Sequence, residues 1–250
     1  MKEMSLIEHL EELKKSAISV LIIIVVAFFV TYGFSDQLAE IILSPLRIAL
    51  KNTAAAGGGQ IIYLGILDKM IAQLQLSLWC AVILSGPAWF YQIWRFVRPG
   101  LHEHEAKAVK PFLMFGLFLF WSGVCFTYFV VFPFGFKLML EYGVTDVVAT
   151  ISLREYLALA VKLMLAFGFL FQVPNIMLIL GFMGVINQEQ LRIHRRYVYV
   201  GLSVLAAIFS PPDIFSMMIV WVPMVVLYEV GLLGVALIVR PYLDRKDSLP

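Results

Sequence analysis

The sequence predicts an all-α, polytopic membrane protein with six transmembrane helices, and three observations support this fold class. Hydrophobic residues make up 61% of the 250 residues and charged residues only 14%, with a mean hydropathy of +0.89, which is typical of a chain solvated by lipid. Apolar runs of about 20 residues, enough to cross a hydrocarbon core of about 30 Å, recur along the chain. If the N-terminus is cytoplasmic, thirteen of the nineteen Lys and Arg residues fall on the cytoplasmic side, so we expect both termini there.

Six apolar segments are expected to cross the membrane, and together they form a single transmembrane domain of residues 1–250. The polar first fifteen residues differ from the basic start of a cleaved signal sequence, so the first apolar segment should be retained. The outward segment 35–69 spaces its apolar residues as a helix lying on the membrane surface would. The approximate bounds of the expected spans are 16–34, 70–93, 111–134, 156–185, 197–209 and 214–239.

The fifth expected span is too short for a bilayer of normal thickness. Its thirteen residues rise about 20 Å at about 1.5 Å each, and the sixth span follows after a tight turn. We therefore expect these two spans to thin the membrane locally and to form a docking edge for a single-span partner, with Ser210 and Met217 among the docking residues. The alternative is that both helices are longer, with Arg195 and Arg196 reaching the surface from deeper positions.

Composition and motifs argue against several functional classes. The net charge of +2 is small and dispersed, so nucleic-acid binding is not expected. Cys80 and Cys125 lie inside apolar runs and are expected to be core residues. The sequence HEHE at residues 102–105 places alternate side chains on different helix faces and makes a poor metal site. We therefore expect no metal site there, and neither HExxH nor a nucleophile paired with a base, which an intramembrane protease would need, is present.

Polar residues inside the expected spans leave a second function open, an ion-coupled transporter for a small solute. Ionisable groups within a membrane are costly and usually functional, and the candidates are Lys162 and Glu229, with the neutral Gln172 between them and Asp213 in the turn before the sixth span. Lys162 could instead extend to the surface, and Glu229 could lie near the cytoplasmic end of its span. Broken helices in matching halves, which would favour a midplane substrate site, are not evident.

Carboxylates in the first cytoplasmic segment provide candidate binding residues. Ser5 and Glu8 have the spacing of a capping box, which predicts a short amphipathic helix running toward the first span. Glu11 can pair with Lys15 four residues on, whereas Glu8 and Glu12 share one face with no cation one turn ahead. These two acidic groups are therefore expected to lack a local partner.

The segment after the second expected span shows the same contrast. Glu103 can pair with Lys107, whereas Glu105 faces apolar residues one turn ahead. Glu105 is thus a third carboxylate without a local cation. Unpaired carboxylates at a membrane surface are usually only solvated, so charge spacing alone does not assign them a function.

Four segments stand out in chain order: HLEEL, FVRPGLHEHE, FQVP and SPPDIFS. They resemble the signature segments of the TatC family, the signal-peptide receptor subunits of the twin-arginine protein translocase. The resemblance extends along essentially the whole chain, and it implies a non-enzymatic receptor in a bacterial, archaeal or organellar inner cytoplasmic membrane. Such a receptor binds the twin-arginine signal peptides of folded precursors at its cytoplasmic face. It assembles with TatA- and TatB-type single-span partners, and we expect a homo-oligomer in that complex.

The resemblance also implies a set of binding residues. Carboxylates matching Glu12 and Glu105 are implicated in arginine recognition in that family, and a guanidinium group forks onto carboxylates better than an ammonium group does. Phe96 is expected to pack against the first helix, and Pro99 to end the second span, so that both shape the site rather than touch the arginines. Glu8 and Glu103 complete the expected binding set.

Two positions depart from the family pattern. Lys14 follows HLEEL where the family usually has Arg, and Gln172 precedes the VP of the fourth span where the family usually has Glu. A charge-dependent role at position 172 is therefore in doubt, although an amide can still donate and accept hydrogen bonds. Pro174, two residues on, is expected to bend this helix.

Overall fold

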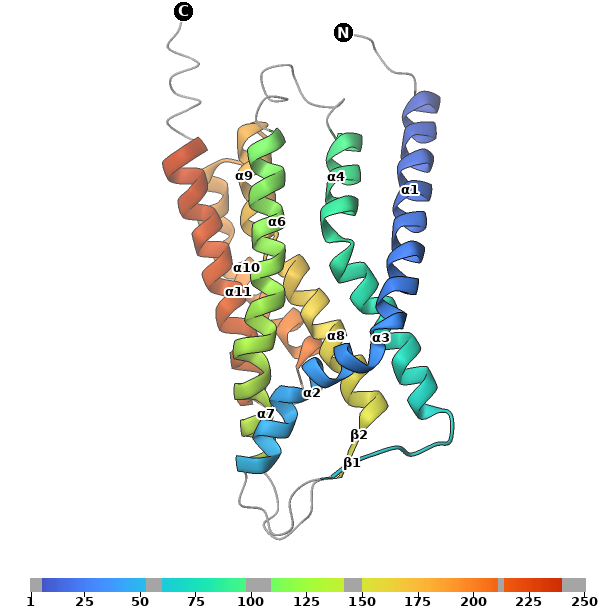
Figure 1. Cartoon of the computed structure of the whole chain (residues 1–250). Helices are drawn as coiled ribbons and strands as arrows, with labels where there is room; N and C mark the ends of the chain where they lie inside the picture. The colour runs from blue at the N-terminus through green and yellow to red at the C-terminus, as the bar shows by residue number, and fades with distance from the viewer. Residues whose placement is uncertain (1–5, 53–59, 98–108, 142–149, 211–213, 240–250) are drawn as a thin grey trace, which may run out of the picture. The chain divides into compact units, whose positions relative to one another are not determined.

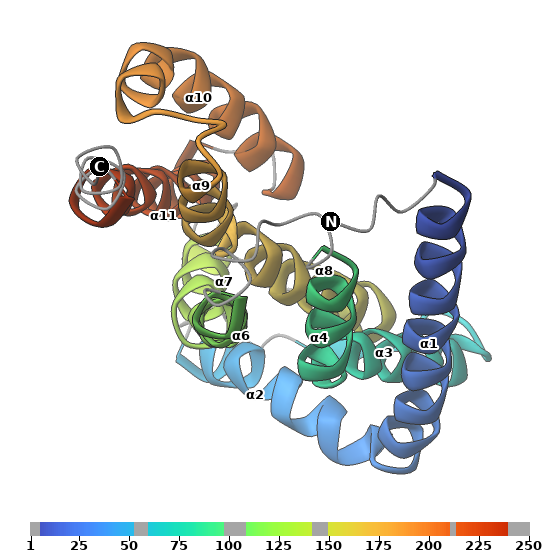
Figure 2. The ribbon, with the colours of Figure 1, turned by 90° about the horizontal axis from the view of Figure 1, so that it is seen from above.

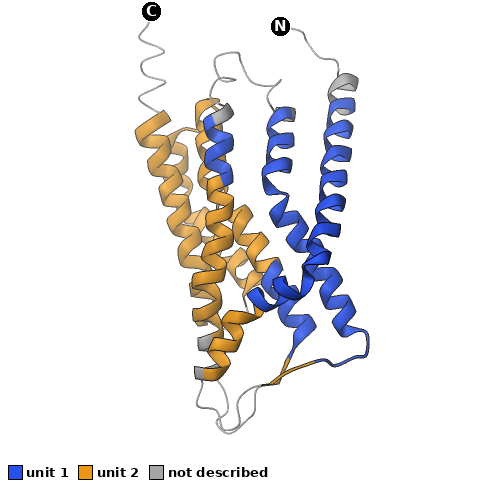
Figure 3. Cartoon of the chain, viewed as in Figure 1, with its two compact units in different colours: residues 1–42, 63–117, 152–161 blue, residues 43–62, 118–151, 162–250 orange. Residues whose placement is uncertain are grey.

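The computed structural model describes residues 6–52, 60–97, 109–141, 150–210 and 214–239. Its regular structure within these ranges is helical except for two three-residue strands, β1 (Gln60–Ile62) and β2 (Thr150–Ser152), which pair with each other (Figure 1). The predicted all-α class is confirmed. The chain divides into two compact units, which are described in turn: residues 1–42, 63–117 and 152–161, and residues 43–62, 118–151 and 162–250 (Figure 3).

In the first unit, the N-terminal helix packs against two others, beside which it lies in Figure 2. The hydroxyl of Thr31, near the end of the first helix, donates a buried hydrogen bond of 2.8 Å to the carbonyl oxygen of Ser77. Polar contacts between helices persist in apolar surroundings because neither group has water as an alternative partner. The three helices are α1 (Leu6–Gly33), α3 (Asp68–Leu84) and α4 (Gly86–Val97).

The second expected span is a bent pair of helices. The axes of Asp68–Leu84 and Gly86–Arg95 meet at 52°, because Pro87 has no N–H to donate and interrupts the helical hydrogen bonds. The indole of Trp89 donates to the carbonyl oxygen of Val82 at 2.9 Å, across the bend. The sequence analysis did not anticipate this bend.

Three helices are divided between the two units. They are α2 (Ser35–Asn52), α6 (Val109–Phe126) and α8 (Leu153–Leu170). The expected surface segment does form a helix in α2, although four of its apolar side chains are buried within the protein: Ile42, Leu43, Leu46 and Leu50. The position of this helix on the membrane surface stays a prediction.

In the second unit, the last long helix packs against three others. Glycines set close approaches between helices of this unit: a Cβ atom added at Gly123 would lie 2.5 Å from the carbonyl oxygen of Phe167. Small residues let helix backbones come together in this way. The elements that belong wholly to the unit are β1, η2 (Thr127–Val131), α7 (Phe132–Glu141), α9 (Val173–Phe182), α10 (Gln188–Phe209), α11 (Ile214–Gly234) and η3 (Val235–Val239), the two η elements being π-helical.

The expected fourth span is interrupted just before Pro174. A turn at Phe171 and Gln172 separates α8 from α9, and Pro174 stands in the first turn of α9, where its missing N–H costs no helical hydrogen bond. Gln172 is buried, and its amide oxygen accepts from the side-chain nitrogen of Asn175 at 3.4 Å.

Four described segments are long and apolar enough to cross a membrane, and the bent pair raises the number to five. The four are Glu11–Gly33, Pro111–Phe136, Leu153–Phe182 and Ile214–Val239. The fifth expected span, residues 197–209, is the second part of the longer helix α10, which begins at Gln188. The six-span count and the orientation of the chain stay predictions.

Candidate functional site

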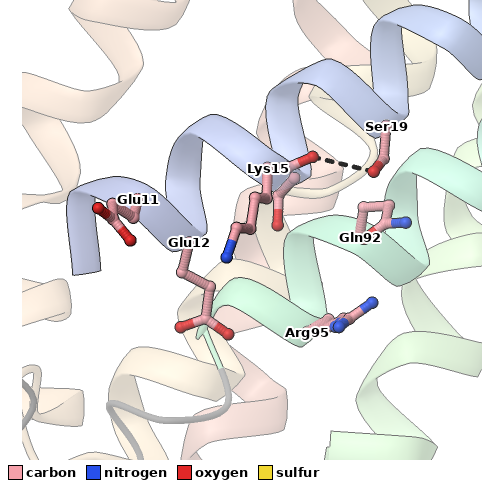
Figure 4. Close-up of a pocket in the computed structure, with 7 residues that line it drawn as sticks. Glu11, Glu12, Lys15, Ser19, Gln92 and Arg95 are labelled. Carbon is pink, nitrogen blue, oxygen red and sulfur yellow. Dashed lines mark hydrogen bonds between the residues drawn. The ribbon is translucent and has the colours of Figure 1, made fainter. Parts of the chain in front are cut away.

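A polar pocket of about 500 Å³ lies between the first turns of α1 and the end of α4, within the first unit. Figure 4 shows Glu12 and Lys15 extending from α1 toward α4, which carries Gln92 and Arg95. Two carboxylates and two cations lie among neutral polar groups, so the pocket presents both signs of charge. The lining residues are Glu11, Glu12, Lys15, Ser16, Ser19, Gln92 and Arg95.

On α1 the pocket side chains follow helical spacing. Glu12, Ser16 and Ser19 recur every three or four residues and therefore share one face of the helix. The hydroxyl of Ser19 donates to the carbonyl oxygen of Lys15 at 2.9 Å (Figure 4). This hydroxyl proton is used within the helix, and the hydroxyl oxygen can still accept a hydrogen bond from a ligand.

On α4 the pocket side chains lie opposite a buried aromatic face. Trp89, Phe90 and Trp94 are buried, and the ring of Trp94 stacks on that of Phe112 in α6, with 6.4 Å between the centroids. Packed aromatic rings fix the rotation of a helix about its axis, because any other rotation would expose them. The polar side chains of Gln92 and Arg95 are thereby held toward the pocket.

Glu12 is the pocket residue with a carboxylate oxygen that lacks a hydrogen-bond donor in the described part of the chain. Its side chain is half-buried, and its Oε2 atom is buried and accepts no hydrogen bond from the residues that the structure describes. A buried acceptor without a donor typically costs about 1–3 kcal/mol. A cationic, multivalent donor would remove this cost, and guanidinium has the geometry to do so.

The other expected binding residues are not tested by the structure. Glu8 lies in the first turn of α1 and Phe96 in the last turn of α4, but their side chains are outside the described part. Helix α4 is described as far as Val97, so the expected end of the second span at Pro99 stays a prediction. Three expected residues lie outside the described ranges: Pro99, Glu103 and Glu105.

The intramembrane candidate Glu229 has partners within its own unit. Its carboxylate forms an ion pair with Arg195 and accepts a hydrogen bond from the hydroxyl of Tyr199, both on α10. The indole of Trp221 donates to the carbonyl oxygen of Tyr199 at 3.1 Å. This network joins α10 to α11, so Glu229 has a structural role in the described fold.

The remaining candidates fall in different settings. Lys162 is exposed on α8. Ser210 ends α10, with its hydroxyl oxygen buried and without a hydrogen-bond partner in the described ranges. Met217 is half-buried in the first turn of α11, whereas Asp213 lies outside the described residues.

The α4 half of the pocket and the partners of Glu229 were not predicted from the sequence. Gln92 and Arg95 are three residues apart in an apolar helix and share one face, so their spacing could have predicted a polar face on this helix. Arg195 and Tyr199, four residues apart, form the same pattern on α10. Recognising either pair as a site required knowing which helix faces it.

The described ranges hold no group of three or more His, Cys, Asp or Glu side chains able to bind a metal ion. The HEHE segment at residues 102–105 lies outside those ranges. The described part therefore offers no metal centre, and the pocket between α1 and α4 is the candidate binding site.

The helices and the pocket define a multi-pass, all-helical membrane protein with a carboxylate-containing polar pocket. Among protein-family models, residues 8–223 match the family described as Sec-independent protein translocase protein (TatC). The chain belongs to the TatC family of twin-arginine protein translocases, whose role is protein transport.

Similar proteins support this assignment along most of the chain. The Sec-independent protein translocase protein TatC of Desulforapulum autotrophicum is 35% identical over 242 residues, covering 96% of this chain and 86% of that protein. The protein of the same name from Escherichia coli strain K12 is 33% identical, covering 90% and 86%. A crystal structure described as the twin-arginine translocase receptor TatC superposes with a TM-score of 0.81 at 30% identity, covering 92% of this chain and 99% of that one.

Proposed function

We propose that this protein is a receptor that binds twin-arginine signal peptides of folded precursors through the pocket between α1 and α4. The main observation that supports this proposal is the buried Oε2 atom of Glu12, which has no hydrogen-bond donor among the described residues. The similar crystal structure is described as a twin-arginine translocase receptor, which agrees with this role. The pocket faces the cytoplasm of a cell whose inner membrane holds both termini of the chain on that side.

The chemistry favours an arginine ligand over a lysine ligand. A guanidinium group is planar and permanently charged and can donate two parallel hydrogen bonds to one carboxylate. Lys15 and Arg95 also line the pocket, and their positive charges oppose the binding of a cation that makes no directed hydrogen bonds. A ligand must therefore gain directed hydrogen bonds to Glu12, which an ammonium group supplies less well. Glu105 contributes the second carboxylate, and Glu8 and Glu103 belong to the same proposed binding set.

Binding of a signal peptide is one step of transport, and the protein assembles with other subunits for the rest. The partners are single-span subunits of the TatA and TatB types, which dock at the edge formed by α10 and α11 near Ser210 and Met217. Several copies of the receptor associate in the complex. The protein acts as a receptor and scaffold rather than an enzyme, and it uses no cofactor.

The test compares peptide binding by purified wild-type protein and by Glu12→Gln, measured by fluorescence titration of a labelled signal peptide. Loss of one charge-assisted contact should weaken binding by about 1.5–3 kcal/mol, roughly tenfold to 150-fold in Kd. A peptide with both arginines replaced by lysine should bind the wild-type protein more weakly than the arginine peptide does.

Glu40→Gln is the matched control, because Glu40 is an exposed carboxylate of the same unit outside the pocket. It should bind the arginine peptide as the wild-type protein does. Equal affinity of the wild-type and Glu12→Gln proteins for that peptide would contradict the assignment of the pocket.

The alternative function, an ion-coupled solute transporter, loses its main support in the structure. Glu229 is engaged by Arg195 and Tyr199, so it is not an uncommitted proton or ion ligand. Gln172 is neutral and buried beside Asn175. Receptor function is therefore the better account of the polar residues.

A further inference from the structure

Helix α10 carries two exposed arginines that the receptor function does not use. Arg192 and Arg196 are four residues apart and therefore share one face of the helix. Arg192 has no hydrogen-bond or ion-pair partner among the described residues. Glu189, in the first turn of the helix, is the exposed carboxylate nearest in sequence. The two arginines and this one carboxylate together leave a net positive charge.

The side chain of Arg196 is held beside an exposed aromatic ring. Its guanidinium carbon lies 4.8 Å from the centroid of the Tyr197 ring, and one of its nitrogens donates to the Tyr197 hydroxyl at 3.0 Å. A tyrosine with an apolar ring and a polar tip is suited to the boundary between hydrocarbon and headgroups. The arginine and the tyrosine thus form an ordered pair at the polar end of α10.

Arg195 lies between these two arginines in the sequence, but its side chain reaches α11 instead of the outer surface of α10. Its guanidinium group is paired with Glu229 on α11, which uses the carboxylate that could otherwise neutralise its neighbours. The positive charges of Arg192 and Arg196 therefore remain directed to the outer surface of α10.

An exposed apolar stripe begins beside Arg192 and Arg196 and runs along α10. Its members recur every three or four residues, so they line one side of the helix, next to Arg196. Between 56% and 68% of each residue is exposed, so the stripe is open to contact with an acyl chain. The stripe consists of Ile193, Tyr197, Val200, Val204 and Ile208.

We infer that this end of α10 is a binding site for an anionic phospholipid. The phosphate oxygens accept hydrogen bonds from Arg192 and Arg196, and one acyl chain lies along the stripe from Tyr197 toward Ile208. Arginine forks match phosphate as they match carboxylate. A single lipid supplies both the anion and the apolar chain that the surface requires. An anionic headgroup is favoured because a zwitterionic one carries its own cation, which two arginines repel.

The experiment measures thermal unfolding of the full-length protein in detergent with added phosphatidylglycerol, phosphatidylethanolamine or inorganic phosphate. Phosphatidylglycerol should raise the Tm of the wild-type protein more than the other two additives do. In Arg192→Gln/Arg196→Gln the affinity for phosphatidylglycerol should fall at least tenfold. Equal protection by phosphatidylethanolamine or by inorganic phosphate would overturn the inference, because it would show general lipid binding or an anion site without an acyl chain.

Arg47→Gln/Lys51→Gln is the matched control, because it removes two exposed cations with the same four-residue spacing from α2. It should retain the phosphatidylglycerol effect, and an equal loss in both double variants would show nonspecific charge attraction. Native mass spectrometry of the wild-type protein gives a second measurement that needs no variant. Preferential retention of phosphatidylglycerol supports the site, and equal retention of the two lipids contradicts it.

Discussion

Gly123 is the position where one added methyl group should disturb the helix packing most directly. In Gly123→Ala the new Cβ atom would lie 2.5 Å from the carbonyl oxygen of Phe167 and 2.9 Å from its carbonyl carbon. Both are backbone atoms, so a change of rotamer cannot relieve the contact. The backbones of α6 and α8 must separate by at least 0.5 Å to bring the shorter distance to 3.0 Å.

The expected cost follows from two opposing effects. Overpacking a filled interface typically costs about 1–3 kcal/mol, whereas replacing Gly by Ala within a helix typically stabilises by about 0.5–1 kcal/mol. The net loss for Gly123→Ala should be about 1–2 kcal/mol. Gly201→Ala on α10 is the matched control, because no atom lies within 4 Å of its added Cβ, and this variant should be as stable as the wild type or slightly more stable.

The assay is reversible unfolding in mixed micelles with increasing sodium dodecyl sulfate, followed by the circular dichroism of the helices. Gly123→Ala should unfold at a lower fraction of the denaturing detergent than Gly201→Ala. If the two variants unfold together, α6 and α8 do not approach as closely as the structure shows, and the reasoning is refuted.

Three further predictions concern the second unit and the pocket. A double-mutant cycle on Arg195 and Glu229, measured by the same unfolding assay, should give a coupling of about 0.5–1.7 kcal/mol, the range for polar contacts in membrane helices; a value near zero would indicate a solvent-screened pair. Phe96→Ala should weaken signal-peptide binding in the fluorescence titration, whereas unchanged affinity would mean that Phe96 only anchors α4 at the interface. Spin labels along residues 197–209 should report a short buried stretch with thinned lipid beside it, and a stretch as long as that of α6 with normal lipid thickness would exclude local thinning.

Much of the fold could be predicted because membrane helices leave long apolar runs in the sequence. The ends of those helices were harder to predict, since a helix can continue through polar residues where an apolar run stops. Helix α10 begins at Gln188, nine residues before the expected start, because Asn187 and Gln190 form a capping box there. Its first turns contain the arginines that bounded the apolar run. The bend before Pro87 was missed because a proline in an apolar run does not change its hydropathy.

The candidate site was predicted in part, for a related reason. Charge spacing along one helix predicted no local cation for Glu12. Lys15 and Arg95 line the same pocket, although the Oε2 atom of Glu12 accepts no hydrogen bond from the described residues. Spacing cannot show that Gln92 and Arg95 face Glu12, since that depends on how α1 packs against α4. In the same way, the partners of Glu229 are more than 25 residues away in sequence, beyond the reach of any test based on one helical turn.

Few side chains of α1 are buried, although the helix packs against α3 and α4, so α1 can tilt about its anchored end. Only 6% of the most apolar window of Glu11–Gly33 is buried, while its far end is fastened by the hydrogen bond from Thr31 to Ser77. Glu12 lies nineteen residues before Thr31, so a tilt of about 5° about that anchor would move Glu12 by about 2.4 Å over a length of about 28 Å. A displacement of that size decides whether a carboxylate reaches a guanidinium group. We therefore expect lateral pressure from the lipid around α1 to change the width of the pocket.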